Sequence, residues 1–424
     1  MVKHSNVNTI PFFREAAPYI HGHRDKTFVV AFAGEVIEMP QFRQHLQDLA
    51  IISSLGVRLV LVHGTRPQID LRLQETNQSI QFHKGIRVTD TNALKAAQEA
   101  IGFLRIKIEN LLTHALSQPS LSNQALGLIS GNFITAKPLG VIDGVDYAYS
   151  GSVRKINHEL IQQQLQNHNL VLLSPIGYSP TGEAYNLRYE QVAIAAAKAI
   201  QADKLIFLSA HPIDLPEELT LEEAYHYNTH PLMAAVLEAL EMHIDRVHLL
   251  DAAQDGTLLL ELYTRDGSGS LIAAEQFETL RQATIEDIGG ILELIRPLEQ
   301  KGILVKRSRE QLELEINKFS VITRDREIIA CVALYDTSDA GIGELACLAV
   351  NPHYRGGNRG DKLFKYVEQA AISQGKKQLL VLTTQTTDWF KERGFVKGNI
   401  EALPANKRAI YNYDRNSQIL FKTL

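Results

Sequence analysis

Apolar runs of strand length alternate with helical stretches through the first two-thirds of the chain, and this alternation constrains the fold most. The runs at 27–32 (TFVVAF) and 58–62 (RLVLV) predict buried strands, with an amphipathic helix at 42–55 between them. Further helices are predicted at 91–116 and 191–200, and further strands at 170–174, 204–209, 247–250 and 257–262. Such alternation is typical of an α/β sandwich with a largely parallel sheet.

A second pattern begins after the Gly/Ser-rich cluster TRDGSGS at 264–270. Helices are predicted at 285–298 and 308–318, followed by strands at 320–323, 328–335 and 344–350. A glycine-rich turn then leads into a helix at 361–374 and a last strand at 378–383. This order predicts a compact α+β module of ordinary domain size. We therefore expect one domain over 1–272, a linker over 273–280 and a second domain over 281–424.

Composition excludes several classes of protein. A chain of 424 residues is long for one core, which agrees with two domains. The net charge of −5 argues against non-specific nucleic-acid binding, and the absence of long apolar runs argues against a membrane protein. Only two cysteines, Cys331 and Cys347, and scattered histidines leave a metal site or disulfide framework without support. We expect a cytoplasmic protein.

A glycine-rich turn joins the strand at 344–350 to the following helix. It reads Arg355-Gly356-Gly357-Asn358-Arg359-Gly360. Backbone N–H groups at a helix N-terminus bind anions, and glycines let a phosphate approach the backbone. Taken alone, the motif is equally compatible with an ordinary strand-to-helix turn.

The order of elements around this turn, ending in DWFKERGF, resembles the GNAT acetyltransferase superfamily. The pyrophosphate loop of that superfamily has the form (Arg/Gln)-x-x-Gly-x-(Gly/Ala). Arg355 and Gly360 match it, whereas Asn358 occupies the central glycine position and has to tolerate a positive φ. The resemblance implies acetyl-CoA as cosubstrate, bound by Leu348, Val350, Arg355, Gly356, Gly357, Asn358, Arg359 and Gly360.

Longer segments resemble the bacterial N-acetylglutamate synthase family over about residues 10 to 424. They are RQATIEDIGGILELIRPLEQKGILVKRSREQLE, GELACLAVNPHYR, LTTQTTDWFKERGF and YNYDRNSQIL. The resemblance implies acetyl transfer from acetyl-CoA to the α-amine of L-glutamate, the first step of arginine biosynthesis. It also implies L-arginine as allosteric effector and a homo-hexamer.

Acyl transfer to an amine requires a free lone pair, a polarised thioester carbonyl and a proton for the departing thiolate. Glu344 in GELACL matches the proposed base of the family, and backbone N–H groups near Cys347 and Leu348 are candidates for polarising the carbonyl. Without the resemblance, Glu344 reads as a solvated strand-end carboxylate. Thr383 matches the proposed acid, and its neighbour Thr384 leaves this assignment open.

Glutamate carries two carboxylates, and arginine binds carboxylates well because its planar fork donates two parallel hydrogen bonds. Arg307 and Arg415 match the glutamate-binding arginines of the family. Lys306 is a secondary candidate, and Cys347 joins this set as a buried small side chain rather than as a nucleophile. The alternative for the charged residues is solvent exposure at turns.

The N-terminal part resembles arginine-sensitive N-acetylglutamate kinases in FREAAPYI, LGVRLVLVHG, HKGIRVTD, GVDYAYSGSVRKI, ADKLIFLS and LLLELYTRDGSGS. Three phosphoryl-transfer elements of those kinases are altered. The Lys before Gly-Gly is missing from Ala31-Phe32-Ala33-Gly34, the Gly-Gly-Gly loop is replaced by Gly64-Thr65-Arg66-Pro67, and N-x-N-A-D by Asn186-Leu187-Arg188-Tyr189-Glu190. A bulky Arg66 prevents the close approach that a phosphate needs. We expect an inactive kinase fold.

The same resemblance implies an arginine site in this domain. Tyr19 matches an inward aromatic residue of the N-terminal helix, Glu261 the carboxylate that pairs with a guanidinium, and Gly267 to Gly269 the lining backbone, with Lys198 as a weaker candidate. The alternatives are helix packing for Tyr19 and a solvent-facing strand carboxylate for Glu261.

Two other functions stay open. One is an arginine-responsive acylamino-acid kinase with an accessory acetyltransferase domain, against which the altered kinase elements weigh. The other is a catalytically silent arginine sensor, against which Glu344, Arg307 and Arg415 weigh. The sequence leaves undecided whether arginine inhibits or activates, and whether acetylornithine donates acetyl.

Overall fold

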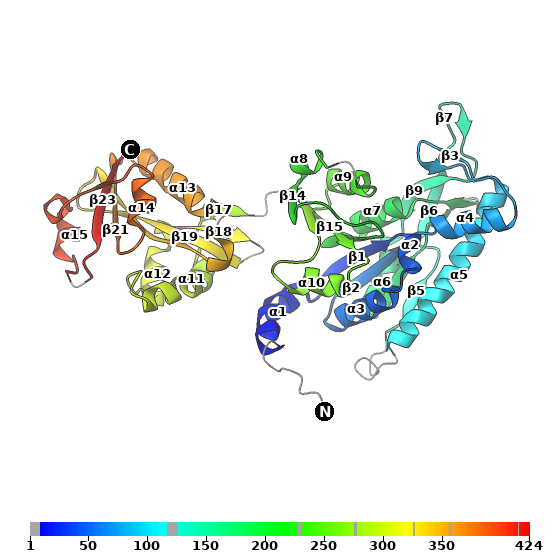
Figure 1. Cartoon of the computed structure of the whole chain (residues 1–424), viewed down its shortest axis with the longest axis horizontal. Helices are drawn as coiled ribbons and strands as arrows, with labels where there is room; N and C mark the ends of the chain where they lie inside the picture. Colours follow the sequence, from blue (N-terminus) through cyan, green and yellow to red (C-terminus); the bar gives the residue numbers. More distant parts are fainter. Residues whose placement is uncertain are drawn as a thin grey trace. The chain divides into compact units, whose positions relative to one another are not determined.

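The computed structural model of the chain describes residues 9–116, 126–227, 230–274, 278–324, 327–355, 358–413 and 415–424. The chain divides into two compact units, Met1–Glu275 and Gln276–Leu424. Figure 1 shows both, and each is considered by itself.

An eight-stranded sheet forms the centre of the N-terminal unit (Figure 1). Neighbouring strands run parallel except for one antiparallel pair, β15 with β16. The predicted largely parallel sheet is therefore confirmed. Its strands in spatial order are β14 (Glu218–Thr220), β16 (Ser270–Ala273), β15 (Arg246–Asp251), β13 (Lys204–Ser209), β1 (Thr27–Phe32), β2 (Arg58–His63), β10 (Leu170–Leu173) and β5 (Leu128–Ser130).

Helices cover both faces of this sheet. Along β1, Val29 and Ala31 pack into one hydrophobic cluster and Phe28, Val30 and Phe32 into the other, because successive side chains of a strand point to opposite faces. A strand covered on both sides needs an uninterrupted apolar run, as the sequence has here. The first face is covered by α6 (His158–Gln166), α7 (Tyr189–Ile200) and α9 (Met233–Glu241), the second by α1 (Thr9–His23), α3 (Phe42–Ser54), α5 (Thr91–Leu116) and α10 (Thr257–Tyr263).

Smaller elements complete this unit. A four-stranded sheet has the order β12 (Ala184–Asn186), β11 (Ile176–Tyr178), β6 (Ile134–Pro138) and β9 (Gly151–Ile156). The remaining elements are the hairpins β3 (Phe82–His83) with β4 (Ile86–Arg87) and β7 (Val141–Ile142) with β8 (Val145–Asp146), and the short helices α2 (Gly34–Ile37), α4 (Arg66–Glu75) and α8 (Leu221–Ala224).

The strand predicted at 257–262 is wrong, because this segment is the helix α10. Leu258 and Leu262, four residues apart, are buried in the second cluster, whereas Leu260 between them is exposed. That spacing is helical, and leucine is a good helix former. Three consecutive leucines concealed the period, so Glu261 lies on a helix and not on a strand.

The C-terminal unit is built on a seven-stranded sheet, antiparallel except for β20 with β21. In spatial order the strands are β17 (Thr279–Gln282), β18 (Phe319–Arg324), β19 (Glu327–Asp336), β20 (Ile342–Val350), β21 (Gln378–Thr383), β23 (Gln418–Thr423) and β22 (Val396–Lys397). Both the predicted helices and strands of the α+β module are present.

Helices pack on both faces of this second sheet (Figure 1). One cluster includes α11 (Ile288–Gln300) and α12 (Arg309–Glu315), and the other α13 (Arg359–Ser373). Shorter elements are α14 (Thr387–Lys391), α15 (Ala405–Ala409) and the 3₁₀ turns η1 (Ile285–Asp287), η2 (Ile316–Lys318), η3 (Pro352–Tyr354) and η4 (Ile400–Ala402).

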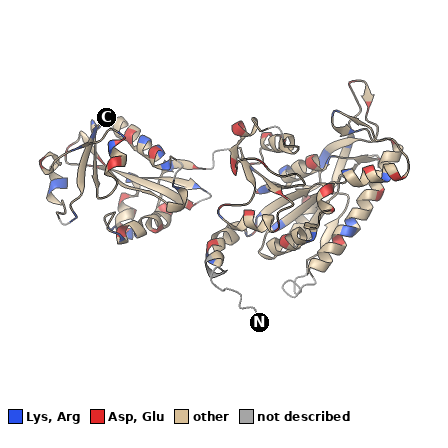
Figure 2. Ribbon diagram, viewed as in Figure 1, with Lys and Arg blue, Asp and Glu red and all other residues tan. Residues whose placement is uncertain are grey.

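The predicted linker, 273–280, overlaps the two flanking strands, since β16 ends at Ala273 and β17 begins at Thr279. Lys and Arg are interspersed with Asp and Glu on the helices of both units (Figure 2). Within the described ranges, no helix combines the length and apolar character needed to cross a bilayer.

Candidate functional site

A β-bulge in β20 decides which side chains of the C-terminal unit share a face. In the ladder with β19, Cys331 pairs with Ala349 and Ala333 with Ala346, so Cys347 and Leu348 together oppose one residue. Cys347 adopts φ +55°, a conformation uncommon outside glycine and found at bulges.

The bulge brings Glu344 and Cys347 to the same side of the sheet. Glu344 lies directly opposite Tyr335, which packs with the cluster of α11 and α12 to which Cys347 belongs. Residues three apart on a regular strand point to opposite faces, whereas an inserted residue reverses the alternation. Beyond the bulge, Leu348 and Val350 are half-buried against the α13 cluster.

The parallel pairing of β20 with β21 is short. It covers Ile342, Gly343 and Glu344, and the ladder ends there although β20 continues to Val350. The bulged residues Cys347 and Leu348 follow this point and also fall outside the regular ladder with β19. The strands therefore open beside Glu344, where backbone donors are available to a ligand.

Glu344 is buried and carries a partner that the sequence did not indicate. Oε2 of Glu344 forms an ion pair with Nζ of Lys407 from α15. The same ammonium lies 5.6 Å from the ring centroid of Tyr335. The alternative of a solvated strand-end carboxylate is wrong, because the carboxylate is covered and paired. No pattern in the sequence connects α15 to this strand.

Arg307 and Arg415 lie close enough for their charges to interact. Nη1 of Arg307 donates to the carbonyl of Val305 at 2.9 Å, and Nη2 of Arg415 donates to the carbonyl of Ile303. Burial, and then the charge of Arg307, lower the pKa of Arg415. Among the described residues, Nε of Arg415 is buried without a partner, whereas the backbone N–H of Arg307 donates to Oε1 of Glu299 at 2.9 Å.

The two guanidiniums share a partly buried setting. Burial disfavours the charged form of Arg307, but the Cys347, Tyr335 and Glu315 side chains outweigh it and raise the pKa of this arginine. Two adjacent, partly buried cations repel each other, so an anionic ligand beside both would be stabilising. Lys306 is exposed, and no contact between described residues joins it to this pair.

Thr383 ends β21 and is buried. Its Oγ1 accepts long hydrogen bonds from the backbone N–H groups of Gln385 at 3.4 Å and Thr386 at 3.3 Å. The same oxygen lies 3.2 Å from Oγ1 of Thr386, and either hydroxyl can donate in this contact. Thr384 is half-buried.

At the glycine-rich turn, Asn358 has φ +55° and precedes the first residue of α13, so it adopts the positive φ expected of it. The side chain of Arg359 is engaged internally, because Nε donates to Oε1 of Glu278 at 2.6 Å and Nη1 to the carbonyl of Tyr354 at 2.7 Å. Its backbone N–H, in the first turn of α13, has no helical partner and stays available to an anion.

The other residues expected to bind coenzyme A lie around this helix start. Arg355 is exposed, and Gly356 and Gly357 lie outside the described residues. At Gly360, a Cβ atom would lie 3.3 Å from Cζ2 of Trp389, so glycine permits the close approach of this ring.

In the N-terminal unit, Glu261 is a buried carboxylate with several donors. It accepts hydrogen bonds from the backbone N–H groups of Ser268 at 2.9 Å and Gly269 at 3.1 Å, and from Nδ1 of His248 at 2.6 Å. Burial opposes ionisation, but these bonds outweigh it and lower the pKa of Glu261 to about 2. Burial lowers the pKa of His248 to about 4, so at neutral pH a neutral histidine donates to an anionic carboxylate.

The loop after α10 is shaped around this carboxylate. Gly267 has φ +66°, and a Cβ atom there would lie 2.6 Å from Oε2 of Glu261. Tyr19 is half-buried on α1 against the cluster that contains α10, and His23 of α1 packs edge-on to Tyr263 with ring centroids 5.7 Å apart. Tyr19, Glu261 and the glycine loop thus belong to one face of the unit.

Lys198 does not belong to this group. It is exposed on α7, which covers the opposite face of the sheet from α10. Lys204 takes its place, because Nζ of Lys204 lies 3.3 Å from Nε2 of His248. Neither Lys204 nor His248 was predicted from the sequence. Each is a polar residue in an otherwise apolar strand segment, and no other feature of the sequence points to it.

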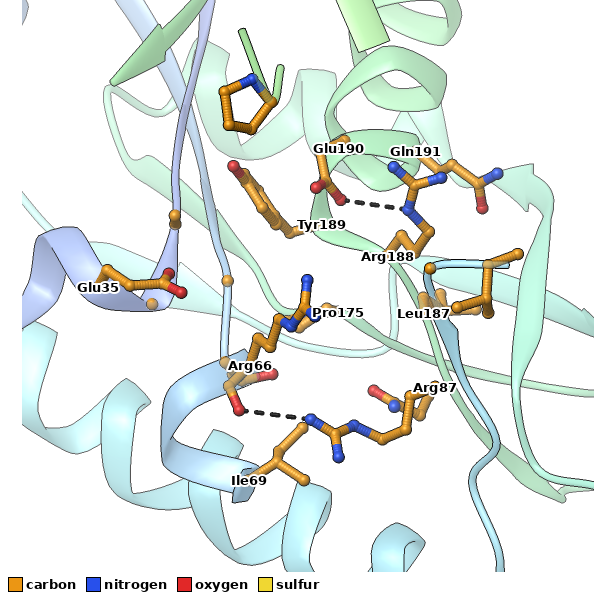
Figure 3. A pocket seen from close by; sticks show the side chains of 18 of the residues that line it. Glu35, Arg66, Ile69, Arg87, Pro175, Leu187, Arg188, Tyr189, Glu190 and Gln191 are labelled. Atoms are coloured by element: carbon orange, nitrogen blue, oxygen red, sulfur yellow. Dashed lines mark hydrogen bonds and ion pairs between the residues drawn. The ribbon is translucent and has the colours of Figure 1, made fainter. Parts of the chain in front are cut away.

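The three altered kinase elements converge on one cavity of about 370 Å³ at the ends of β1 and β2. Arg66, Arg188 and Glu190 line it, and Figure 3 shows their side chains around the opening. Nε of Arg188 lies 3.6 Å from Oε2 of Glu190. Arg66 begins α4, so a side chain rather than bare backbone meets the cavity at this helix start.

Arg87 also lines this cavity and is buried. Its Nη2 pairs with Oδ1 of Asp70 at 2.5 Å. Its guanidinium group also packs over the ring of Phe82, with 4.7 Å between the guanidinium carbon and the ring centroid. In the part of the chain that the structure describes, no three His, Cys, Asp or Glu side chains cluster in a way that could hold a metal ion.

Comparison with known proteins agrees with both units. Residues 26–251 match the amino acid kinase family, and residues 315–397 match the acetyltransferase (GNAT) domain. An amino-acid acetyltransferase of Azotobacter vinelandii is 48% identical, covering 98% of this chain and 99% of its own. One from Pseudomonas fluorescens has the same identity and coverage.

Two solved structures are similar over 98% of this chain and 99% of theirs. One is the crystal structure of N-acetylglutamate synthase from Neisseria gonorrhoeae complexed with coenzyme A and L-arginine, with a TM-score of 0.89 and 37% identity. The other is the same synthase complexed with coenzyme A and N-acetyl-glutamate, with a TM-score of 0.62 and 38% identity.

Proposed function

Because this chain belongs to the amino-acid acetyltransferase family, we propose that it transfers acetyl from acetyl-CoA to the α-amine of L-glutamate and is regulated by L-arginine. This reaction is the first step of arginine biosynthesis. The observation that carries the proposal is the adjacent, partly buried pair Arg307 and Arg415. Arg307 interacts with Tyr335, the cross-strand neighbour of the buried carboxylate Glu344. A dicarboxylate with one amine matches two cations and one base.

In the proposed reaction, Glu344 accepts a proton from the α-ammonium and frees the nitrogen lone pair. The nitrogen attacks the thioester carbon, and backbone N–H groups at Cys347 and Leu348 stabilise the negative charge that develops on the carbonyl oxygen. The C–S bond then breaks, Thr383 donates a proton to the departing thiolate, and the nitrogen returns its second proton to Thr383, which leaves a neutral amide and a neutral threonine. The free N–H groups at the start of α13 bind the pyrophosphate of coenzyme A.

The direct test offers the full chain acetyl-CoA with one amino acid at a time and follows coenzyme A release. We expect glutamate to react far faster than aspartate, glutamine or ornithine, because only glutamate supplies both carboxylates at the right separation. Equal rates with glutamine would contradict the proposed use of both arginines.

We place the arginine site around Glu261, with Tyr19, Lys204, His248 and the loop at Gly267 to Gly269. An anionic carboxylate in a mostly buried setting is the natural partner for a guanidinium. Its two oxygens keep lone pairs after accepting the three bonds described above.

Replacing Glu261 by Ala is expected to abolish the effect of arginine while leaving basal kcat largely unchanged. An allosteric ligand acts only through its different affinities for two states, and losing the buried carboxylate removes the ligand's charged partner. Rates with and without arginine, together with calorimetric arginine binding, provide the measurement. Asp266→Ala is the control, because this carboxylate lies nearby and is exposed. Normal arginine binding by the Glu261 variant would place the site elsewhere.

ATP is expected not to bind the full chain at millimolar concentration. The cavity in the kinase-like unit lacks a lysine at Ala31 to Gly34 and presents Arg66 where a phosphate needs bare backbone. Isothermal titration with ATP and magnesium, with coenzyme A as the positive control, measures this. Saturable ATP binding would revive phosphoryl transfer as an activity of this unit.

The remaining parts of the proposal concern organisation. We assign residues 1–272 to a kinase-inactive, arginine-binding domain and 281–424 to the GNAT acetyltransferase domain. We also propose a cytoplasmic homo-hexamer, which light scattering on the purified chain tests directly.

A further inference from the structure

The ion pair between Glu344 and Lys407 lies inside the proposed reaction centre. Lys407 is on α15, a single helical turn whose four other residues are exposed. Only 16% of the Lys407 side chain and 11% of the Glu344 side chain is accessible to solvent. The lysine is thus the one residue of α15 that reaches inward.

The turn that carries Lys407 is tied to the sheet near Glu344. The backbone N–H of Asn406 donates to Oγ of Ser338 at 3.2 Å, and the backbone N–H of Ser338 donates to Oδ1 of Asn406 at 3.0 Å. Ser338 lies in the turn between β19 and β20. These bonds hold α15 at the edge of the site, while the long side chain of Lys407 supplies the freedom to change partner.

Burying a lysine has a cost in rotamer entropy and in desolvation, and a pairing with one carboxylate offsets it only in part. A site that binds an amino acid has a reason to retain such a pair. The carboxylate and ammonium of Glu344 and Lys407 are the electrostatic complement of the ammonium and carboxylate that every α-amino acid carries on one carbon.

We propose that Lys407 holds, before glutamate arrives, the position that the substrate α-ammonium takes against Glu344, and that it then pairs with the substrate α-carboxylate. Both charges of the resident pair find new partners in this exchange, and no covalent bond changes. The inference rests on Glu344 as the base. It makes Lys407 a substrate-binding and positioning residue that discriminates α-amino acids from simple amines.

The exchange has opposite consequences for two ligands. When Lys407 is replaced by Met, the α-carboxylate of glutamate keeps one of the two arginines but loses its second partner. Its KM should therefore rise roughly 10- to 100-fold, as for a lost hydrogen bond between charged groups. The analogue 4-aminobutyrate has an ammonium and one carboxylate but no α-carboxylate. In the wild type, 4-aminobutyrate has to displace Lys407 without offering its ammonium an α-carboxylate as new partner. It should therefore inhibit the Met variant as well as or better than the wild type.

The exchange also predicts a split in the pH profiles. In the free enzyme the ammonium of Lys407 contacts the carboxylate of Glu344. The other polar groups around this carboxylate are Tyr335, its cross-strand neighbour, and Arg307 and Glu315, which both interact with Tyr335. Without the lysine, the acid limb of kcat/KM, which reports the free enzyme, should move to higher pH. The acid limb of kcat should stay, because the substrate ammonium has by then replaced the lysine.

The experiment uses the full chain with Lys407→Met, Lys407→Arg and Lys397→Met, the last an exposed lysine of the same unit. KM for glutamate, inhibition by 4-aminobutyrate and both pH profiles are measured, with the KM for acetyl-CoA as the check on folding. Lys407→Arg keeps a cation beside Glu344, so the acid limb of its kcat/KM profile should stay near that of the wild type. This comparison remains informative if the Met variant folds poorly. Lys397→Met should change none of these.

The exchange would be overturned if Lys407→Met weakened the binding of glutamate and of 4-aminobutyrate equally. It would also be overturned if this variant lost kcat while the KM for glutamate and the acid limb of kcat/KM stayed unchanged. The base proposal fails separately, if Glu344→Gln retains kcat. A silent Lys407→Met beside an inactive Glu344→Gln would refute the inference and leave the base in place.

Discussion

Replacing Glu344 by Gln is expected to lower kcat by roughly 10²–10⁴-fold, the usual contribution of a general base. Glutamine has the size of glutamate and can still contact Lys407, but it cannot take up the proton of the ammonium. The strand that carries Glu344 also leads into the turn that binds coenzyme A, so the distance from the carboxylate to the acetyl group is set by one continuous backbone segment.

Steady-state rates over a range of pH test this expectation. Activity should recover in part at high pH, where the amine of free glutamate is already unprotonated, and acetyl-CoA binding should be near normal. Glu401→Gln, which changes an exposed carboxylate close to α15, is the matched control and should behave as wild type. Near-normal kcat at neutral pH in the Glu344 variant would mean that water or another residue takes the proton.

Replacing Arg307 or Arg415 by Ala should raise the KM for glutamate by roughly 30-fold or more. The physical reason is that a buried carboxylate deprived of its cation costs about 2–5 kcal/mol. Substitution by Lys should recover only part of the affinity, because an ammonium lacks the planar fork of donors. Arg309→Ala is the control, since Arg309 forms a solvent-exposed pair with Glu313, and such pairs contribute little.

Comparison of glutamate with glutamine separates the two arginines. Glutamine lacks the side-chain carboxylate. When the arginine that binds this carboxylate is replaced by Ala, the variant enzyme should therefore lose most of its preference for glutamate over glutamine. The other arginine should weaken both ligands alike. A KM within threefold of wild type for both variants would show that the two guanidiniums do not bind the substrate.

Much of the architecture followed from periodicity. The strands β1, β13 and β21 lie where uninterrupted apolar runs predicted them, because a strand buried on both faces has no polar position. The same rule could not identify α10, whose consecutive leucines fit a helix or a strand and whose type depends on packing against the second cluster.

The site residues were found through motifs and not through periodicity. GELACL and YDRNSQ pointed to Glu344 and Arg415, and the structure adds that Arg415 lies close enough to Arg307 for the two charges to interact. Lys198, the weaker candidate from the resemblance, is exposed on a helix that covers the other face of the sheet from Glu261. Lys204 and His248 meet through the pairing of β13 with β15, which places Ile206 opposite His248.

The sequence by itself determined the two-domain order, the αβα sandwich, the α+β module and the residue types of the transfer site, because these follow from local patterns and short motifs. Only the tertiary structure decided that Glu344 is paired with Lys407 and that the bulge at Cys347 puts Glu344 and Cys347 on the same side of the sheet. It also decided that the altered kinase elements share one cavity. Each of these depends on contacts between segments far apart in the chain, whose register and facing are set by packing of the whole unit.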